Sequence, residues 1–438
     1  MIGSVIHCLL CPNGGIGRRA GLKHLWETVP VRLRLRVHKS SSVKKGFYHF
    51  VKAESNIFCL LRLRVINLAK SPIFVYIYLL SFQMKNSSFF IGLVFLAQIQ
   101  FSCDTQQSEV PEDSFVRAAD LSSLMELESE PITFYNNNQP EAVITTLKNA
   151  GCNTIRIRLW KNPATVHSSL TEVKAIASRI KSAGMKVWLT VHYSDTWADP
   201  GAQTTPSAWQ NMPFSTLKTS VASYTSLVLS EIHPDIFQIG NEINDGFLWP
   251  HGNLTSNQNQ FLELLQVAST TIRNQAPSTK IMIHYAGITG AASFYDKISA
   301  VDYDYIGLSF YPIWHGKNLT TLQNTITTLG QRNNKKVLIA ETSYPFTLSW
   351  NDWTNNIVGL DTQIIPGYSP TPDGQKSYLL AIKSMLKASP YGGGFAYWGS
   401  ELVAFKGPQA TNGSPWENQA LYDFSNNLLP VIAVFGAN

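Results

Sequence analysis

Cysteine is scarce in this sequence, and most of it lies outside the long C-terminal part. Five cysteines occur among 438 residues, and three of them, Cys8, Cys11 and Cys59, fall within the first 83 positions. Cys8 and Cys11 have the spacing of a metal-binding pair, but no second pair follows, so we interpret the spacing as chance. Cys103 and Cys152 remain, which excludes a disulfide framework for the main domain.

Acidic residues are almost missing from the first 83 positions, which hold 2 Asp and Glu against 13 Lys and Arg. The rest of the chain holds 27 acidic and 22 basic residues. The excess of positive charge therefore belongs to one end of the chain, and the main domain is mildly acidic. This balance argues against nucleic acid as a partner, because a phosphate backbone is bound through clustered Lys and Arg.

The sequence also lacks an apolar run of the roughly 20 residues needed to cross a bilayer. The stretch Met84–Cys103 begins with a lysine, continues with a short apolar segment and ends in Ser–Cys, which is typical of a secretory signal. This ending resembles a bacterial lipoprotein cleavage site, so we predict a lipoprotein-type signal over 84–103 with lipidation at Cys103. Residues 104–113 would form a polar tether. We therefore expect an exported cell-envelope lipoprotein held at the membrane by its lipid, or a secreted protein without that lipid.

A start at Met84 would leave the preceding residues without a role in front of a signal. Gly14–His24 also resembles the translation of an upstream RNA gene, so we predict that 1–83 is a mis-annotated N-terminal extension. The alternative is a basic arm with a membrane segment at Ile73–Phe82, but ten apolar residues are too few to span a bilayer.

From residue 114 onward, short apolar runs alternate with amphipathic stretches. The candidate strands are Phe115–Leu121, Thr154–Leu159, Lys186–His192, Ile236–Gly240, Ile281–Tyr285, Tyr305–Phe310, Lys336–Ala340 and Gly394–Trp398. Eight such repeats predict an α/β fold, a (β/α)8 TIM barrel that forms a single catalytic domain over 114–435. The alternative, an open doubly wound sheet, usually has a Gly-rich phosphate turn after its first strand. Here that position holds Asp120-Leu-Ser-Ser, which argues against it.

Two glutamates each end a short apolar run. Glu242 ends the run Asp235–Glu242, and Glu341 ends the run Lys336–Glu341. A strand-end Glu paired with a nearby Arg explains either one alone, but a buried strand has no packing reason to end in a charge. Two facing carboxylates at the mouth of a barrel are what glycosidic bond cleavage needs. One protonates the leaving oxygen, and the other attacks or stabilises the sugar cation.

Polar and aromatic side chains follow nearly every predicted strand, whereas the strand interiors are aliphatic. The set comprises Arg158, His192, Asp195, Trp197, Asp199, Asn241, Trp249, His284, Tyr311, Trp314 and Trp398. Any one of these histidines or tryptophans alone is more often structural. Together they indicate an extended neutral polysaccharide, because aromatic faces stack on pyranose rings and polar side chains bind hydroxyl groups. A phosphorylated ligand would require Gly-rich nests and clustered basic residues, which the sequence lacks.

The segment from about 114 to 435 resembles glycoside hydrolase family 53, the endo-β-1,4-galactanases that cut arabinogalactan. The matching stretches are Gly151–Trp160, Val191–Gly201, Gln238–Glu242 and Ser414–Phe424. These stretches are long and scattered across the whole predicted barrel. A lone Asn–Glu would indicate only the wider clan of retaining barrel hydrolases.

The resemblance implies that Glu242 is the general acid/base and Glu341 the nucleophile of a retaining, endo-acting hydrolysis of β-1,4-galactan. Glu242 then needs a raised pKa, and Glu341 must stay ionised, for which we expect Arg158 and the Tyr311 hydroxyl as partners. Asn241 would hydrogen-bond the 2-hydroxyl of the sugar, and retention requires the two carboxyl groups roughly 5–5.5 Å apart. The expected galactose-binding subsites are formed by His192, Asp195, Asp199, Trp249, His284, Trp314 and Trp398.

The resemblance implies no required cofactor, but bacterial members of the family often carry a calcium ion in the loop after the seventh strand. Asp352 and Asn356 remain possible ligands, yet Trp350 and Thr354 stand where Asp and His are expected. Because Ca²⁺ takes six to eight oxygen ligands, we expect the ion to be absent rather than bound. Without it, Trp350 and Trp353 would extend the sugar-stacking surface.

Two alternatives to a galactanase remain. One is another polysaccharide hydrolase of the same clan, a β-mannanase or a β-glucanase, because subsite specificity does not follow from the residues alone. The other is a non-catalytic glycan-binding barrel on the cell surface, which usually follows the loss of a catalytic carboxylate. Both carboxylates are present, so the expected partners are β-1,4-galactan and the arabinogalactan side chains of pectin, bound by a monomer.

Overall fold

The computed structural model describes residues 115–437. The predicted extension 1–83, the signal 84–103 with Cys103 and the tether 104–113 lie outside the described residues. Among the residues described, no helix is long and apolar enough to span a membrane.

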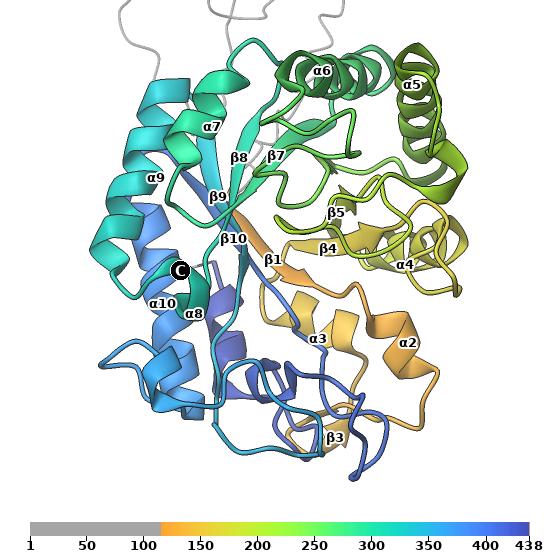
Figure 1. Cartoon of the computed structure of the whole chain (residues 1–438). Coiled ribbons are helices and arrows are strands. Elements are labelled where there is room, and N and C mark those ends of the chain that lie inside the picture. The colour runs from red at the N-terminus through yellow and green to blue at the C-terminus, as the bar shows by residue number, and fades with distance from the viewer. Residues whose placement is uncertain (1–114, 438) are drawn as a thin grey trace, which may run out of the picture. The chain divides into compact units, whose positions relative to one another are not determined.

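Eight parallel strands form a closed barrel, which confirms the predicted fold class (Figure 1). The strands are β1 (Val116–Asp120), β4 (Thr154–Leu159), β5 (Lys186–Val191), β6 (Ile236–Ile239), β7 (Lys280–Ala286), β8 (Tyr305–Ser309), β9 (Lys336–Thr342) and β10 (Gly392–Tyr397). Their order is β1-β10-β9-β8-β7-β6-β5-β4, so that β1 pairs with both β4 and β10 and closes the ring. Each of the eight predicted strands corresponds to one of these.

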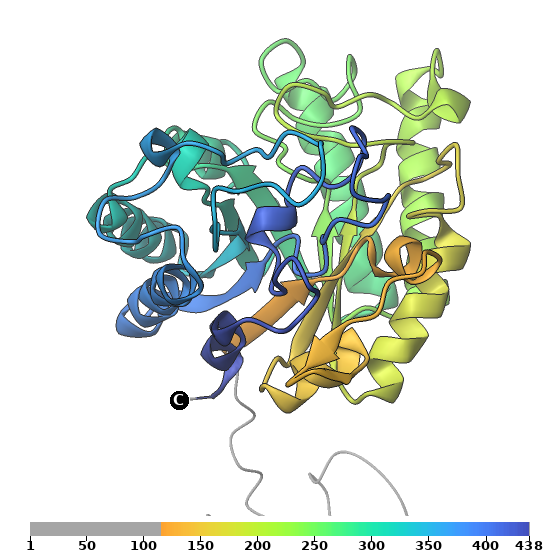
Figure 2. The same ribbon diagram turned by 90° about the horizontal axis from the view of Figure 1, so that it is seen from below.

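Helices surround the barrel, as Figure 2 shows after a quarter turn. The longer ones are α3 (Val143–Asn149), α4 (Leu170–Ser182), α5 (Phe214–Ile232), α6 (Gln258–Gln275), α7 (Ala291–Lys297), α9 (Leu319–Asn333) and α10 (Pro372–Ala388). Short elements are the helices α2 (Leu124–Glu128) and α8 (Pro312–His315) and the hairpin of β2 (Tyr135–Asn136) and β3 (Gln139–Pro140). Helix α4 begins where Ser169 accepts a hydrogen bond from the Glu172 amide, because a capping side chain satisfies an amide that has no partner inside the helix.

The strands alternate between two cores, as the pleat of a β-strand requires. In β4, Ile155, Ile157 and Leu159 point outward and pack in the large hydrophobic layer beneath the helices. A smaller cluster that includes Trp188 and Met282 fills the barrel interior. Toward the C-terminal strand ends this interior becomes polar. The fold thereby carries a polar site on a rigid apolar base.

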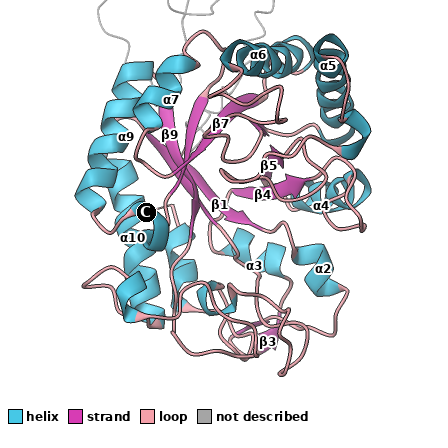
Figure 3. Ribbon diagram, viewed as in Figure 1, coloured by secondary structure: helices cyan, strands magenta, loops and turns pink. Residues whose placement is uncertain are grey.

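Long loops follow the strands at one end of the barrel, and in Figure 3 those after β9 and β10 lie in the lower part of the view. The segment after β9 and the segment after β10 are the longest of these, because α10 and the final 3₁₀ turn Pro430–Phe435 begin only many residues later. Cys152, which precedes β4, is buried as a free thiol. This end of the barrel carries the residues that the sequence singled out.

Candidate active site

A cavity of about 780 Å³ opens at the C-terminal ends of the strands, and we call it the cleft. Residues from all eight strands or the loops that follow them line it. Its lining includes Ser122, Ser123, Glu126, Arg156, Arg158, His192, Trp197, Asp199, Asn241, Glu242, Ala286, Tyr311, Trp314, Glu341, Trp398, Lys406 and Trp416. This position is where a (β/α)8 barrel builds its active site.

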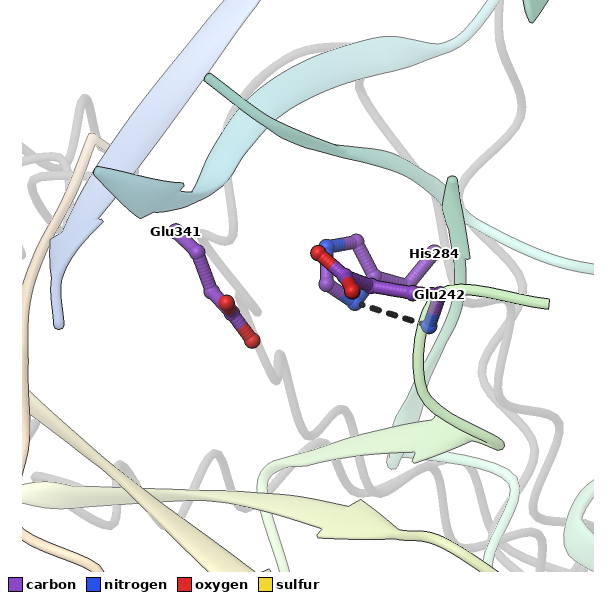
Figure 4. Close-up of side chains that lie close together, drawn as sticks. All are labelled: Glu242, His284 and Glu341. Carbon is purple, nitrogen blue, oxygen red and sulfur yellow. Dashed lines mark hydrogen bonds between the residues drawn. The ribbon is translucent and has the colours of Figure 1, made fainter. Parts of the chain in front are cut away.

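Glu242 and Glu341 face each other across the cleft floor. Glu242 follows β6 in a left-handed backbone conformation with φ of 48°, and Glu341 lies in β9. One carboxyl oxygen of each lies within 4.8 Å of the other. Figure 4 shows the two side chains directed into the space between their strands, with His284 beside Glu242. The pair therefore meets the geometric requirement for two carboxyl groups acting on one bond.

Arg156 and Tyr311 hold the two oxygens of Glu341. Arg156 Nη2 lies 2.7 Å from Glu341 Oε1, and the Tyr311 hydroxyl donates to Oε2 at 2.9 Å. Burial raises the pKa of Glu341, while the positive charge of Arg156 and the hydrogen bond from Tyr311 counteract the rise. The expectation that Tyr311 contacts Glu341 is confirmed.

The expectation that Arg158 is the cationic partner of Glu341 is wrong, because Arg156 forms that ion pair. Both arginines point into the barrel, since they are two positions apart in one strand. Arg156 lies deeper and also bonds Asp120 at 2.5 Å and Asn241 Oδ1 at 3.0 Å. Arg158 lies one inward step nearer the mouth. Side chains alternate between the two faces of a strand, so the sequence pattern placed both arginines on the inward face and did not show which one reaches Glu341.

Arg158 is instead held between two indole rings. Its guanidinium carbon lies 4.4 Å from the ring centroid of Trp160 and 4.0 Å from that of Trp197, and its Nε donates to Ser168 Oγ at 2.9 Å. Stacking of this kind is attractive, because the ring faces carry negative charge density. Arg158 therefore fixes the aromatic wall of the cleft.

Glu242 is the carboxyl group with the stronger tendency to keep a proton. Burial, followed by the charge of Glu341, raises the pKa of Glu242 to about 8. Ser309 donates a hydrogen bond to Glu242 Oε1 at 2.5 Å, which partly opposes the rise. Glu242 has no ion pair with a Lys or Arg of the described residues, in contrast to Glu341. The two carboxyl groups thus have different environments, as an acid and a nucleophile require.

Aromatic rings run around the cleft mouth in contact with one another. The centroid separations are 5.4 Å from Trp160 to Trp197, 6.4 Å from Trp197 to Trp398, 4.3 Å from Trp398 to Trp416 and 6.0 Å from Trp416 to Trp314. Trp197 is 47 % exposed and Trp314 is 54 % exposed, so both present open faces to solvent. Trp416 belongs to the matching stretch Ser414–Phe424, but it follows no predicted strand directly, so no local pattern singled it out.

The other predicted site residues divide into two groups. His192, Asp199, Asn241, Trp314 and Trp398 line the cleft as expected. Asp195, Trp249 and His284 do not, and they hold neighbouring structure instead. Asp195 accepts from the Ser207 amide and hydroxyl, and Trp249 Nε1 donates to the Asp245 carbonyl. His284 is fully buried below Glu242.

Glu242, His284 and Glu341 lie close enough to share a metal ion. Both ring nitrogens of His284 are already in hydrogen bonds, Nε2 with Ser309 and Nδ1 with Gln238. Arg156 also places a positive charge directly against Glu341. This arrangement satisfies the histidine and one carboxylate without a cation, so we interpret it as a hydrogen-bonded carboxyl pair.

The possible calcium ligands Asp352 and Asn356 lie in the loop after β9. Asp352 Oδ1 accepts from the Thr354 amide, whereas Asp352 Oδ2 and Asn356 Oδ1 are buried without a hydrogen-bond partner. Glu417 Oε2 is another buried oxygen without a partner, and the charge of Asp352 acts on Glu417. Oxygens of this type suit Ca²⁺, so the residues fit the ion chemically. Backbone carbonyls and water would have to supply the remaining ligands.

The closed barrel and the paired carboxyl groups in an aromatic cleft define a glycoside hydrolase. The profile of glycosyl hydrolase family 53 matches residues 116–435. An arabinogalactan endo-beta-1,4-galactanase of Cellvibrio japonicus is 32 % identical over 344 residues, which cover 74 % of this chain and 91 % of the relative.

Two solved structures agree with this assignment. The Ignisphaera aggregans GH53 catalytic domain is 35 % identical with a TM-score of 0.69, covering 74 % of this chain and 97 % of its own. A structure of fungal beta-1,4-galactanases is 29 % identical with a TM-score of 0.64, covering 73 % and 98 %. The chain belongs to glycosyl hydrolase family 53, and the predicted resemblance is confirmed.

Proposed function

We propose that this protein hydrolyses β-1,4-galactosidic bonds inside galactan and arabinogalactan chains, with retention of configuration. The observation that carries the proposal is the pair Glu242 and Glu341, whose nearest carboxyl oxygens are within 4.8 Å. Retaining glycosidases place their carboxyl groups roughly 5–5.5 Å apart, whereas inverting enzymes leave roughly 6.5–9.5 Å for a water molecule. The printed activities of the relatives support galactan as the substrate.

In the first step, Glu341 attacks the anomeric carbon while Glu242 gives its proton to the leaving glycosidic oxygen. Glu341 is suited to attack because Arg156 and Tyr311 stabilise its ionised form through one contact to each oxygen. Glu242 is suited to protonation because burial keeps it neutral below about pH 8. A glycosyl ester on Glu341 results.

In the second step, Glu242 has become a carboxylate and removes a proton from water, which attacks the ester and releases Glu341. Asn241 lines the cleft, and its Oδ1 accepts from Arg156 while its Nδ2 donates to the Ala198 carbonyl. The amide is therefore fixed at the cleft wall, where it would bind a sugar hydroxyl next to the reacting carbon. A calcium ion, where bound, would be held by Asp352, Asn356 and Glu417 and would only fix the loop after β9.

The aromatic rings around the cleft mouth support an endo mode of action. Exposed indole faces of Trp197 and Trp314 lie apart from each other around the mouth, with Trp398 and Trp416 between them. A chain that stacks on more than one of these rings crosses the carboxyl pair at an internal bond. Early products should therefore be mixed galacto-oligosaccharides rather than single galactose units.

Digestion of linear β-1,4-galactan tests the proposal, with Glu242→Gln and Glu341→Gln as paired variants. We expect wild-type protein to release mixed oligosaccharides whose new reducing ends are first formed in the β configuration, as ¹H NMR reports, and both variants to be inactive. Cleavage of mannan or glucan in place of galactan would show that the proposed substrate is wrong, while the catalytic role of the carboxyl pair would stand. Binding of galactan without cleavage of galactan, mannan or glucan would show that the protein is a non-catalytic glycan-binding barrel.

The proposal includes export and a lipid anchor at Cys103, supported by the lysine, the short apolar stretch and the Ser–Cys ending of residues 84–103. Expression of the full chain in a bacterium with radiolabelled palmitate tests this. Label should enter the wild-type protein and be lost in Cys103→Ser. Secretion of unlabelled wild-type protein would show that the proposed lipid anchor is wrong. Light scattering on the same purified protein tests the expectation that it is a monomer.

A further inference from the structure

A row of buried polar side chains lies directly beneath Glu242 and is not used by the chemistry proposed above. Gln238, His284 and Ser309 come from β6, β7 and β8, and each is 0 % exposed. Burial of a polar group is costly unless it is hydrogen-bonded. Each of the three is hydrogen-bonded to the next, and the last is bonded to Glu242.

The direction of these hydrogen bonds is set at the far end, by Trp188. An indole N–H can only donate, so Trp188 Nε1, 3.1 Å from Gln238 Oε1, must face the amide oxygen. The Thr190 hydroxyl donates to the same oxygen at 3.2 Å. The amide nitrogen of Gln238 therefore faces His284. Its nearest acceptors are the Gly240 carbonyl and His284 Nδ1, each 3.0 Å away, and Asn241 Oδ1 lies farther, at 3.2 Å.

These contacts favour one tautomer of His284. Two donors approach its Nδ1, the amide of Gln238 at 3.0 Å and the backbone N–H of Glu242 at 3.4 Å, the contact dashed in Figure 4. Asn241 Oδ1 also lies 3.2 Å from Nδ1, but this oxygen already accepts from Arg156 Nη2 at 3.0 Å. We therefore assign Nδ1 as an acceptor, because two N–H groups face it and the one nearby acceptor oxygen is already bonded to Arg156. Burial, together with the charge of Arg156, holds the pKa of His284 well below its usual value, so the ring is neutral and its single proton sits on Nε2.

The same reasoning fixes the hydroxyl of Ser309. His284 Nε2–H donates to Ser309 Oγ at 2.9 Å, so the one hydrogen of the hydroxyl is free to point the other way. It points at Glu242 Oε1, 2.5 Å from Ser309 Oγ. The opposite direction, from a protonated Oε1 through Ser309 to His284, would require a bare Nε2 and a proton on Nδ1, which would face the N–H groups of Gln238 and Glu242.

We propose that Trp188, Gln238, His284 and Ser309 form a one-directional hydrogen-bond chain that keeps Glu242 Oε1 an acceptor and so confines the transferable proton to Oε2. The proposal rests on the proposed role of Glu242 as acid and base. The four residues touch no substrate and are positioning residues. Oε2 accepts no hydrogen bond from the residues that the structure describes. The oxygen that gives up the proton in the first step is therefore the one that takes a proton from water in the second.

Ser309→Ala tests the chain, because it removes the last donor and leaves the carboxyl free to turn. Its effect is measured as kcat/KM on two substrates: galactan, whose leaving alcohol needs a proton, and a dinitrophenyl β-galactobioside, whose phenolate does not. We expect kcat/KM on galactan to fall at least ~10-fold and on the activated substrate less than ~3-fold, since acid catalysis contributes only to the first. The alkaline limb of the pH profile should also move upward by about one unit, because a donor to the ionised carboxyl is lost.

His284 supplies a second pair of variants. Gln carries an acceptor oxygen and a donor N–H in one planar group, as the neutral imidazole does, whereas Leu carries neither. His284→Gln should therefore retain the wild-type ratio between the two substrates, and His284→Leu should behave like Ser309→Ala. Ser343→Ala is the matched control, because Ser343 is a buried serine that bonds Gln419 rather than the carboxyl pair.

Equal losses on both substrates in Ser309→Ala, or an alkaline limb that does not move, would overturn the chain, since a merely structural role gives that result. Glu242→Gln separates this failure from failure of the proposed function. If Glu242→Gln spares the activated substrate and Ser309→Ala does not, the acid assignment stands and the chain is wrong. If Glu242→Gln itself fails to distinguish the two substrates, the acid assignment is wrong.

Discussion

Glu401 is a buried carboxyl group whose titration should appear directly in the stability of the protein. It follows β10, is 1 % exposed, and does not belong to the cleft lining. Its Oε1 accepts from the Ser123 amide at 2.8 Å, while Oε2 is buried without a partner. Burial, followed by the charge of Asp120, raises the pKa of Glu401 to about 8 from 4.5.

The sign of the effect follows from this shift. The folded protein holds the Glu401 proton more tightly than the unfolded chain does, so the stabilisation is complete below pH 4.5 and is lost as the pH rises to about 8. At about 1.4 kcal/mol for each pKa unit, the full loss is about 5 kcal/mol. Between pH 5 and pH 9 it is on the order of 4 kcal/mol, which is a large part of the typical stability of a domain.

Glu401→Gln removes the titration and keeps the shape, because an amide can still accept from the Ser123 N–H. Urea unfolding of both proteins at pH 5, 7 and 9 gives the free energy of unfolding, and the difference isolates Glu401 since all other groups titrate in both. We expect the variant to gain on the wild type by on the order of 4 kcal/mol from pH 5 to pH 9. Glu130→Gln, at an exposed position, controls for the loss of one charge. A difference that is constant across the pH range would refute the reasoning.

Three further predictions concern the site. The kcat/KM on galactan should fall as the pH rises through about 8, because Glu242 then loses its acid proton. Burial and the charge of Glu341 raise the pKa of Glu242 to that value, and a pH series that stays flat to pH 10 would contradict this. Arg156→Lys should lower kcat ~100-fold, since the guanidinium reaches its three oxygen partners through two separate nitrogens and a single ammonium nitrogen does not span them, whereas Arg158→Lys should mainly raise KM, and steady-state kinetics on galactan distinguishes the two. EDTA should leave kcat unchanged, because no chemical step uses the Asp352 loop; a loss that added calcium restores would show otherwise.

The barrel was predictable because its strands obey a strict pattern. In β4 the outward positions Ile155, Ile157 and Leu159 are all aliphatic and pack beneath the helices, as a sheet covered on its outer side requires. The two glutamates were predictable because a charge at the end of an apolar strand has no packing role. The aromatic residues after the strands were predictable as a group, because they follow nearly every predicted strand while the strand interiors are aliphatic.

Positions along the barrel axis were not predictable. Arg156 and Arg158 share a face of one strand, and only the closed barrel shows that the deeper one reaches Glu341. Gln238 and Ser309 are single polar residues at inward positions of apolar strands. A polar residue at an inward position of an apolar strand was a signal in the sequence. The hydrogen-bond partners of these residues come from other strands, however, so no local pattern connects them.

The sequence by itself determined the eight strands, the barrel and the two carboxyl groups, because these follow from periodicity and from the cost of burying charge. Only the tertiary structure decided which arginine pairs with Glu341, which indoles meet around the cleft and which way the hydrogen bonds run beneath Glu242. These depend on contacts between strands that lie far apart in the chain. The closure of the barrel sets the distances between them to within a hydrogen bond, and no spacing along the sequence encodes those distances.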